Sequence, residues 1–324
     1  MPSFLYLREG QKSIDKTVYI VYICIYTEYK QFIINPEKGM KIMITLNGVS
    51  KRLGKFQLKN ITFDLPCGYI CGLVGQNGAG KTTLLHLLLG LYRQEEGTLT
   101  IDGMDFEQDE KKLHDRIGTV LVEELFDSSY SIRDNADRYG VYFSKYRWEK
   151  MNAYLEQFKL DPRRKFGKLS KGEKLKCQFA FALSYEPELL ILDEPTGNFD
   201  PEFREQFFRI IQEYIADGTR TVILATHLTD DLDRITDYLI YLENGEQIFA
   251  GDIESFRAEY RIVSGEKYKI NLLPKERIVH MEEKKYGAKA LVVHSKYNKY
   301  EELTVTHPTI EEFMYFYSKR AVEL

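Results

Sequence analysis

Apolar and polar positions follow a regular pattern between Ile42 and Gly251, in which short apolar runs are separated by amphipathic stretches. Near-continuous apolar runs such as 189–192 indicate strands that are buried on both faces. Strands that alternate with helices predict an α/β fold with a mainly parallel sheet covered by helices. The strand candidates are Ile42–Leu46, Ile61–Leu65, Tyr69–Val74, Thr98–Ile101, Gly118–Val122, Leu189–Asp193, Thr221–Ala225, Tyr238–Glu243 and Glu246–Ala250.

Two other regions break this pattern. Residues from about 125 to 187 are helical in pattern and predict an inserted helical subdomain. The first 40 residues contain an apolar run, Val18–Tyr26, which fits an added strand or an extension ahead of an internal start at Met40. A signal peptide is a third interpretation, but no small-x-small cleavage site follows the run. We therefore expect an N-terminal extension over 1–40 and the α/β domain over 41–252.

A small α+β accessory domain is predicted over 253–324. It contains strand-like pieces at Lys269–Leu272, Ala290–His294 and Leu303–Val305. Thr309 and Glu312 then have the spacing of a capping box, which predicts a helix start. One apolar stripe follows on that helix, formed by Ile310, Phe313, Met314 and Tyr317. This stripe indicates a helix that packs on the accessory domain.

Composition narrows the class of protein. The 45 Lys and Arg against 49 Asp and Glu give a net charge of −4, so no nucleic-acid partner is expected. The longest uncharged stretch, Leu65–Gly80, has 16 residues including five glycines, whereas a membrane span needs about 20 mostly apolar residues. Four scattered cysteines form neither a disulfide framework nor a zinc framework, and they are typical of small core residues in a reducing cytosol. They are Cys24, Cys67, Cys71 and Cys177.

A glycine-rich motif is the first feature of the sequence that predicts a chemical function. The sequence Gly75-Gln-Asn-Gly-Ala-Gly80-Lys81-Thr82 matches the phosphate-binding loop, and it lies between a predicted strand and a predicted helix. Glycines let backbone N–H groups surround phosphates, Lys81 adds a positive charge and Thr82 offers a hydroxyl to Mg²⁺. The predicted nucleotide-binding residues are Gly75, Gln76, Asn77, Gly78, Ala79, Gly80, Lys81, Thr82 and Thr83.

A second signal is the apolar strand that ends in Asp193 and Glu194, 112 residues after Lys81. A buried strand can deliver an acidic side chain to the metal beside a phosphate loop, so Asp193 is the candidate Mg²⁺ ligand. Glu194 is the candidate base that polarises the attacking water. Taken alone, such an acidic strand end is more often a cap or a turn, and the phosphate loop in the same chain reverses those odds.

Together these motifs resemble the nucleotide-binding subunits of ABC transporters over residues 42–251. Leu169-Ser170-Lys171-Gly172-Glu173 stands where that family carries its Leu-Ser-Gly-Gly-Gln signature. The resemblance implies a cassette with antiparallel N-terminal strands, and a head-to-tail dimer in which Ser170 and Gly172 of one subunit close over ATP held by another. It also implies that Asp200 lies in the loop that touches the opposite subunit, and that His227 is the switch histidine that senses the γ-phosphate.

Several positions depart from the family pattern. Lys171 and Glu173 replace a glycine and a glutamine of the signature. The glutamine expected after the strand 118–122 is absent, and Glu123 takes its place as a candidate Mg²⁺-sensing residue. In the family an aromatic residue stacks on adenine. Leu53 occupies the expected position of that residue here, and Phe56 is the candidate in its place.

The resemblance implies an ATPase subunit with ATP and Mg²⁺ as cofactors, which powers export through a separately encoded ABC-2-type permease. The departures resemble a bacterial subgroup that exports antimicrobial peptides such as bacitracin. We expect a dimer with itself or with a second ATPase subunit, located in the cytoplasm at the inner face of the membrane. The alternatives are a soluble ABC-type ATPase and a nucleotide-gated binding module that does not hydrolyse ATP.

Overall fold

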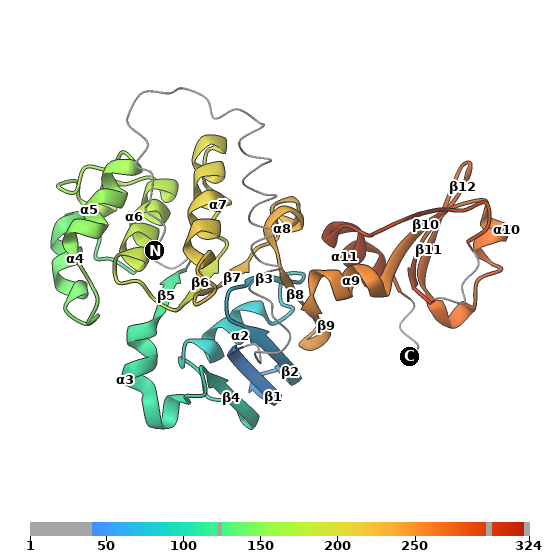
Figure 1. The fold of residues 1–324 in the computed structure, drawn as a ribbon, viewed down its shortest axis with the longest axis horizontal. Helices are drawn as coiled ribbons and strands as arrows, with labels where there is room; N and C mark the ends of the chain where they lie inside the picture. Colours follow the sequence, from blue (N-terminus) through green and yellow to red (C-terminus); the bar gives the residue numbers. More distant parts are fainter. Residues whose placement is uncertain (1–40, 122–124, 296–299, 321–324) are drawn as a thin grey trace. The chain divides into compact units, whose positions relative to one another are not determined.

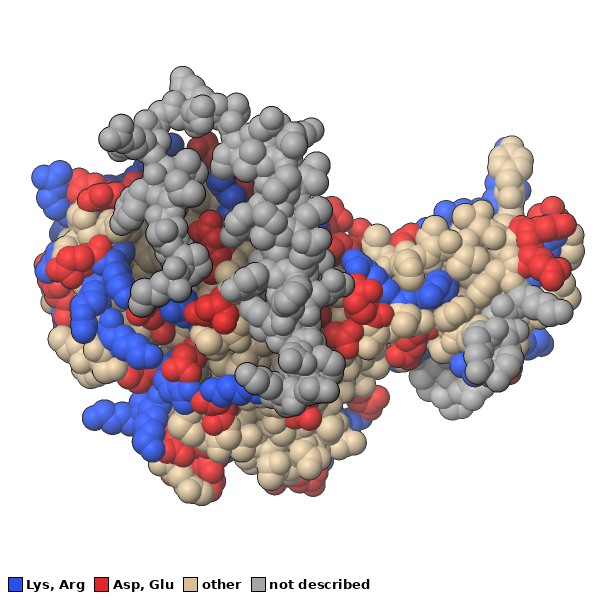
Figure 2. Space-filling model, viewed as in Figure 1, with Lys and Arg blue, Asp and Glu red and all other residues tan. Residues whose placement is uncertain are grey.

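The computed structural model describes residues 41–121, 125–295 and 300–320. The predicted extension over 1–40 and the candidate Glu123 lie outside these ranges. Within them, no helix has both the length and the apolar character needed to cross a bilayer. Basic and acidic side chains are interspersed over the described residues on the face that Figure 2 shows.

A nine-stranded mixed sheet forms the centre of the cassette (Figure 1). Its strands are β1 (Ile42–Leu53), β2 (Phe56–Pro66), β3 (Ile70–Val74), β4 (Glu96–Ile101), β5 (Ile117–Val120), β6 (Leu189–Asp193), β7 (Thr221–Ala225), β8 (Tyr238–Glu243) and β9 (Glu246–Asp252). Their spatial order is β4-β1-β2-β9-β8-β3-β7-β6-β5. From β8 to β5 the neighbours are parallel, whereas β1 is antiparallel to β2 and β4. The predicted parallel body and antiparallel N-terminal strands are therefore confirmed.

Helices surround the sheet, and a group of them interrupts it between β5 and β6. The helices that accompany the strands are α2 (Lys81–Leu88), α3 (Phe106–Arg116), α7 (Pro201–Ile215) and α8 (Thr229–Ile235). The interrupting group is α4 (Ile132–Gly140), α5 (Trp148–Gln157), the 3₁₀ turn η1 (Phe166–Lys168) and α6 (Lys171–Ser184). Phe126 packs edge-on against Phe166 and Phe181 at centroid distances of 5.3 and 5.2 Å, which gives this helical group an aromatic core.

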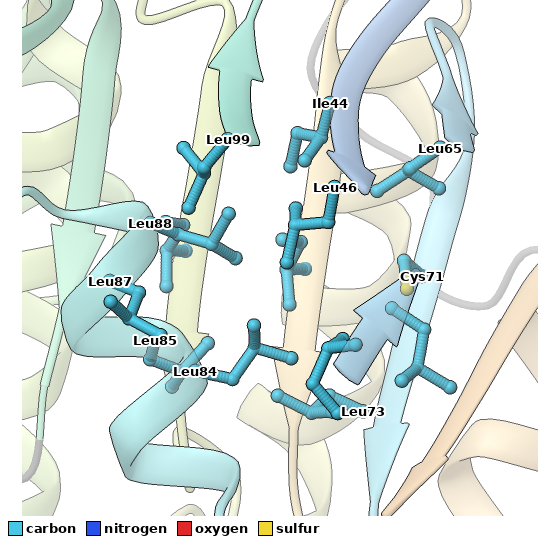
Figure 3. Packing of buried hydrophobic residues seen from close by; sticks show 14 of the residues in the cluster. Ile44, Leu46, Leu65, Cys71, Leu73, Leu84, Leu85, Leu87, Leu88 and Leu99 are labelled. Carbon is cyan, nitrogen blue, oxygen red and sulfur yellow. The ribbon is translucent and has the colours of Figure 1, made fainter. Parts of the chain in front are cut away.

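The helix that follows the phosphate loop is anchored by leucines. Figure 3 shows Leu84, Leu85 and Leu88 of α2 facing Leu46 of β1 and Leu73 of β3, and all five side chains are buried. Burial of each such side chain contributes roughly 2 kcal/mol. The beginning of α2 is therefore fixed on the sheet, and the loop before it is held at the carboxyl end of β3.

The C-terminal part forms a second sheet with its own apolar core. Its strands are β10 (Tyr260–Gly265), β11 (Ile278–Lys284), β12 (Gly287–Val293) and β13 (Thr304–Thr306), all antiparallel in the order β11-β12-β10-β13. Its helical segments are α9 (Ile253–Glu259), α10 (Lys267–Ile270), the turn η2 (Lys275–Arg277) and α11 (Ile310–Ser318). The pattern over 253–324 thus predicts an α+β arrangement that the structure contains.

One local prediction in this part is wrong. Lys269–Leu272 is not a strand, because α10 and the turn after it occupy these residues. Ile270 is 0% exposed and Leu273 is 4% exposed, whereas Leu272 is 79% exposed. A spacing of three between buried positions places both on one side of a helical turn, whereas a strand buries alternate residues.

The predicted helix at the end of this part is present and contacts the cassette. Thr309 caps α11 by accepting from the backbone N–H of Glu312 at 3.0 Å, as its spacing predicts. The backbone N–H of Ile310 donates to the Asp233 carboxylate on α8 at 3.0 Å. Phe313 packs edge-on against Tyr241 of β8 at 5.4 Å. Helix α11 is therefore held by the C-terminal sheet and by two elements of the cassette.

Candidate nucleotide-binding and catalytic site

The loop between β3 and α2 has the geometry of a phosphate-binding loop. Gly75, Gly78 and Gly80 have φ angles of 156°, 81° and 113°, which favour glycine. A Cβ on Gly75 would lie 2.4 Å from the carbonyl oxygen of Leu242, so no larger residue fits there. Residues 76–78 are exposed at the tip of the arch, and the N–H of Ala79 donates to the Gln76 carbonyl at 3.0 Å. The arch therefore presents its backbone to solvent at the positive end of α2.

Lys81 and two threonines occupy the first turn of α2. Lys81 Nζ donates to the carbonyl oxygens of Gly75 at 2.7 Å and Gln76 at 3.3 Å. Partial burial lowers the pKa of Lys81, and the nearby Glu194 and Asp193 carboxylates act in the opposite direction. Thr82 is exposed at the mouth of the loop, whereas Thr83 is buried against the core. The predicted residues of this motif are thus close together, and a role of the buried Thr83 in nucleotide binding stays a prediction.

The sheet places the acidic strand end beside this loop. Leu73 of β3 and Asp193 of β6 both pair with Ala225 of β7, the strand that lies between them. Because carboxyl ends of parallel strands meet at one sheet edge, the loop, the two acids and the residues after β7 share that edge. Asp193 and the Thr82 hydroxyl offer the hard oxygen donors that Mg²⁺ prefers, so these residues fit that ion.

Glu194 and His227 form a direct pair at this edge. His227 Nδ1 lies 2.8 Å from Glu194 Oε2, and the same oxygen accepts from the Thr226 hydroxyl at 3.1 Å. Glu194 has a φ of 48°, an uncommon conformation for a side chain of this size. Its backbone N–H donates to the Ala225 carbonyl at 2.8 Å, which holds the turn in place. The His227 side chain is 65% exposed and the Glu194 side chain is 26% exposed. The histidine therefore faces solvent, whereas most of the glutamate side chain is packed against protein.

The signature segment begins α6, and its two replaced residues have distinct surroundings. Ser170 caps the helix by accepting from the N–H of Glu173 at 3.2 Å, and the Glu173 carboxylate accepts from the N–H of Ser170 at 2.8 Å. Arg164 forms an ion pair with Glu173, whereas Lys171 is exposed. These bonds bring the pKa of Glu173 down to about 2, with Arg164 as the main cause. The negative charge that replaces a glutamine is thus neutralised within the chain.

Two residues couple the signature helix to the loop after β6. A Cβ on Gly172 would lie 2.5 Å from the carbonyl oxygen of Asn198, so this glycine allows close contact with the loop. Asp200 caps α7 by accepting from the N–H of Phe203 at 2.8 Å, and it pairs with Lys176 of α6 at 3.1 Å. The Asp200 carboxylate is therefore bound within its own subunit, and a contact with nucleotide in a partner subunit stays a prediction.

The candidate adenine-stacking residue lies under the phosphate loop. Phe56 is partly buried, and its ring would contact Cβ atoms built on Gly80 and Gly245, at 3.0 and 3.4 Å. The ring therefore packs against the phosphate loop, and stacking on adenine stays a prediction.

Sequence reasoning missed two residues of the site. Arg164 contacts Glu173, and Thr226 contacts Glu194. The only sequence signal for Thr226 is its place directly before His227. No sequence signal points to Arg164, because its partner Glu173 is nine residues away.

Glu173 gives a prediction about pH. Because its pKa of about 2 lies below the ordinary value of 4.5, the unfolded chain binds more protons, so this group stabilises the fold above pH 4.5. That contribution is expected to fade as the pH falls from 4.5 towards 2. The pair is partly exposed, so Glu173→Gln is expected to lower the unfolding free energy by only about 1 kcal/mol at pH 7.

Urea denaturation at pH 7 and pH 3 measures this effect. The difference between wild type and Glu173→Gln is expected to shrink at the lower pH. Glu149→Gln, which removes an exposed carboxylate on α5, is the matched control and should show no such change. An equal difference at both pH values would contradict the assignment of the low pKa to the Arg164 pair.

A glycine loop at the carboxyl end of a parallel strand, an adjacent acidic strand end and a capped signature helix define a nucleotide-binding cassette. A family model described as ABC transporter matches residues 58–197. The Nod factor export ATP-binding protein I of Burkholderia lata is 33% identical over 214 residues, covering 64% of this chain and 70% of that protein. The chain belongs to the ABC transporter family as an ATP-binding subunit, and it is an ABC ATPase.

Further relatives and solved structures agree. The Nod factor export ATP-binding protein I of Sinorhizobium fredii is 34% identical over 216 residues, 65% of this chain and 63% of that protein. A structure described as the ATP-binding subunit of an ABC transporter superposes with a TM-score of 0.63 at 22% identity, covering 66% and 92% of the two chains. A dimeric ATP-binding cassette in a post-hydrolysis state with ADP and Pi gives 0.59 at 22% identity, covering 65% and 99%. These two likenesses show the fold, and they confirm the predicted cassette.

Proposed function

We propose that this ATPase subunit powers export through a separately encoded ABC-2-type permease, at the cytoplasmic face of the membrane. The 2.8 Å pair of Glu194 and His227 beside the phosphate loop is the observation that carries ATP hydrolysis. Export is supported by relatives that are named for Nod factor export. The permease is expected to determine which molecule is exported. An antimicrobial peptide of the bacitracin type is one candidate.

In the proposed reaction the phosphate loop receives the β- and γ-phosphates, and Lys81 Nζ turns from the carbonyl oxygens of Gly75 and Gln76 to the phosphate oxygens. Water attacks the γ-phosphorus while the bond to the bridging oxygen breaks, and Glu194 accepts the proton of that water. His227 holds the Glu194 carboxylate at the sheet edge and contacts the γ-phosphate. A Mg²⁺ ion held by Thr82 and Asp193 supplies positive charge to the phosphate oxygens when it is bound.

The dimer in this proposal is formed by two cassettes placed head to tail. Ser170 is exposed at the beginning of α6, so it and the backbone at Gly172 can face the phosphate loop of a second subunit. Glu123, which lies outside the described residues, stays a candidate Mg²⁺-sensing residue in this proposal. A homodimer would hold two equivalent sites, and a heterodimer with another ATPase subunit would hold two different ones.

Affinity purification of the tagged full chain from detergent-solubilised membranes tests the transport role. A polytopic membrane protein is expected in about equal amount to the ATPase subunit. Recovery of ribosomes or DNA in place of a membrane protein would favour the soluble ABC-type ATPase. A partner that binds while the purified complex shows no ATP turnover would favour the binding module that does not hydrolyse ATP.

A further inference from the structure

A buried polar cluster joins the three segments that surround the Glu194–His227 pair. Asp231, in the first turn of α8, is 5% exposed and accepts from Arg204 Nη2 at 3.0 Å. The hydroxyl of Thr196, which is 2% exposed, lies 3.4 Å from the same carboxylate oxygen. We call Thr196, Asp231 and Arg204 the buried network, in which the Arg204 side chain stays 34% exposed.

Each member of the buried network is close in sequence to a residue of the site. Thr196 follows Glu194 by two residues, and Asp231 follows His227 by four. Arg204 lies in the first turn of α7, which begins directly after Asp200. Because so few residues separate the network from the site, a shift of Thr196 or Asp231 is expected to move Glu194 or His227.

Separating these groups is costly. Burial raises the pKa of Asp231, and the charges of Arg204 and, to a smaller extent, Arg234 oppose that shift. Arg204 Nε is buried and has no hydrogen-bond partner among the described residues. The Asp231 side chain is 7% exposed and that of Arg204 is 34% exposed, so breaking this pair leaves the buried carboxylate without its hydrogen-bonded cation, which disfavours movement of α8 relative to α7.

We propose that the buried network positions His227 against Glu194, and that Thr196, Asp231 and Arg204 are positioning residues for ATP hydrolysis. This inference rests on the proposed function of Glu194 and His227. None of the three side chains contacts the phosphate loop through a hydrogen bond or ion pair among the described residues. We therefore expect these side chains to have little effect on the affinity for nucleotide. A displacement of about 1 Å at a reacting group lowers a rate up to 100-fold, and we expect losses of about tenfold.

The same two helices carry a second ion pair that serves as a control. Glu205 of α7 and Arg234 of α8 meet at 2.9 and 3.3 Å, and both side chains are 52% exposed. This pair also joins α7 to α8, but it is exposed to water, and Glu205→Gln keeps the Arg234 charge that acts on Asp231. A general weakening of the contact between the helices would therefore appear in Glu205→Gln as well.

The experiment measures ATP turnover and KM of the purified full chain. Asp231→Asn is expected to lower kcat about tenfold while KM for ATP changes less than about twofold, and Glu205→Gln is expected to retain kcat. In a His227→Ala background, Asp231→Asn should cause no further loss, because the residue through which it acts is gone. Thr196→Val, which removes only a hydroxyl, should lower kcat in the same direction and provides the test if Asp231→Asn does not fold.

Three results would overturn the positioning role. They are multiplicative losses in the double variant with His227→Ala, an equal loss in Glu205→Gln, and unchanged kcat in both Asp231→Asn and Thr196→Val. Glu194→Gln in the same assay separates the two proposals. If Glu194→Gln retains turnover, the proposed catalytic assignment fails. If only the network variants retain it, the positioning role alone fails.

Discussion

Glu194→Gln is expected to lower the rate of ATP hydrolysis by about 100- to 1,000-fold, which is the size of effect that a general base contributes. Glutamine has the same shape as glutamate, so the turn at φ 48° and the packing below it are retained. The amide cannot accept the proton of the attacking water. Binding of ATP is expected to remain, because the phosphate loop is built from other segments.

Phosphate release by the purified full chain measures this loss, and fluorescence titration with a labelled ATP measures the retained binding. Glu202→Gln is the matched control, because Glu202 on α7 has an 89% exposed side chain and should be without effect on turnover. Turnover in Glu194→Gln equal to that of wild type would show that another group accepts the proton.

Lys81→Ala is expected to weaken ATP binding by at least about 100-fold. Hydrogen bonds from a charged donor contribute about 1.5–3 kcal/mol each, and Lys81 Nζ already holds two acceptors that phosphate oxygens would replace. The lowered pKa of Lys81 means that folding disfavours its charged form, so loss of the charge itself is not expected to destabilise the free protein.

Titration with labelled ATP together with urea denaturation tests both halves of this prediction. Lys59→Ala is the matched control, since Lys59 on β2 is half-exposed and paired with Glu246 at 2.9 Å on the surface. It should change neither quantity strongly. A marked loss of stability in Lys81→Ala would mean that the lysine supports the loop itself, and the loss of ATP binding would then have a structural cause.

The sequence predicts the elements of the cassette well because its strong signals are local. The apolar run 189–192, bounded by Pro187 and by Asp193-Glu-Pro195, favours a short buried strand. Ser170 and Thr309 start helices through bonds to residues three positions away. Glycines at 75, 78 and 80 predict the loop conformation directly, since few other residues adopt the positive φ angles found there.

The rest depends on pairs that are distant in sequence. Arg204 and Asp231 lie 27 residues apart, and nothing around Asp231 distinguishes it from the exposed Asp230 beside it. Only the packing of α8 on α7 decides which of the two acids is buried. The strand predicted at Lys269–Leu272 is wrong for a related reason, since four residues are too few to separate a period of two from one of 3.6.

The docking of α11 has a consequence for how the chain folds during synthesis. Phe313 covers Tyr241, Phe256 and Tyr260, with ring centroids 5.4, 5.0 and 4.6 Å away. Ile310 follows Glu243, the end of β8, by 67 residues, so at about 5–20 residues per second the ribosome needs several seconds to supply this cover. During that time the new cassette already contains its phosphate loop, but the Tyr241 ring is without the cover that Phe313 gives it. Apolar surface exposed in this way favours aggregation of a nascent chain until α11 is made.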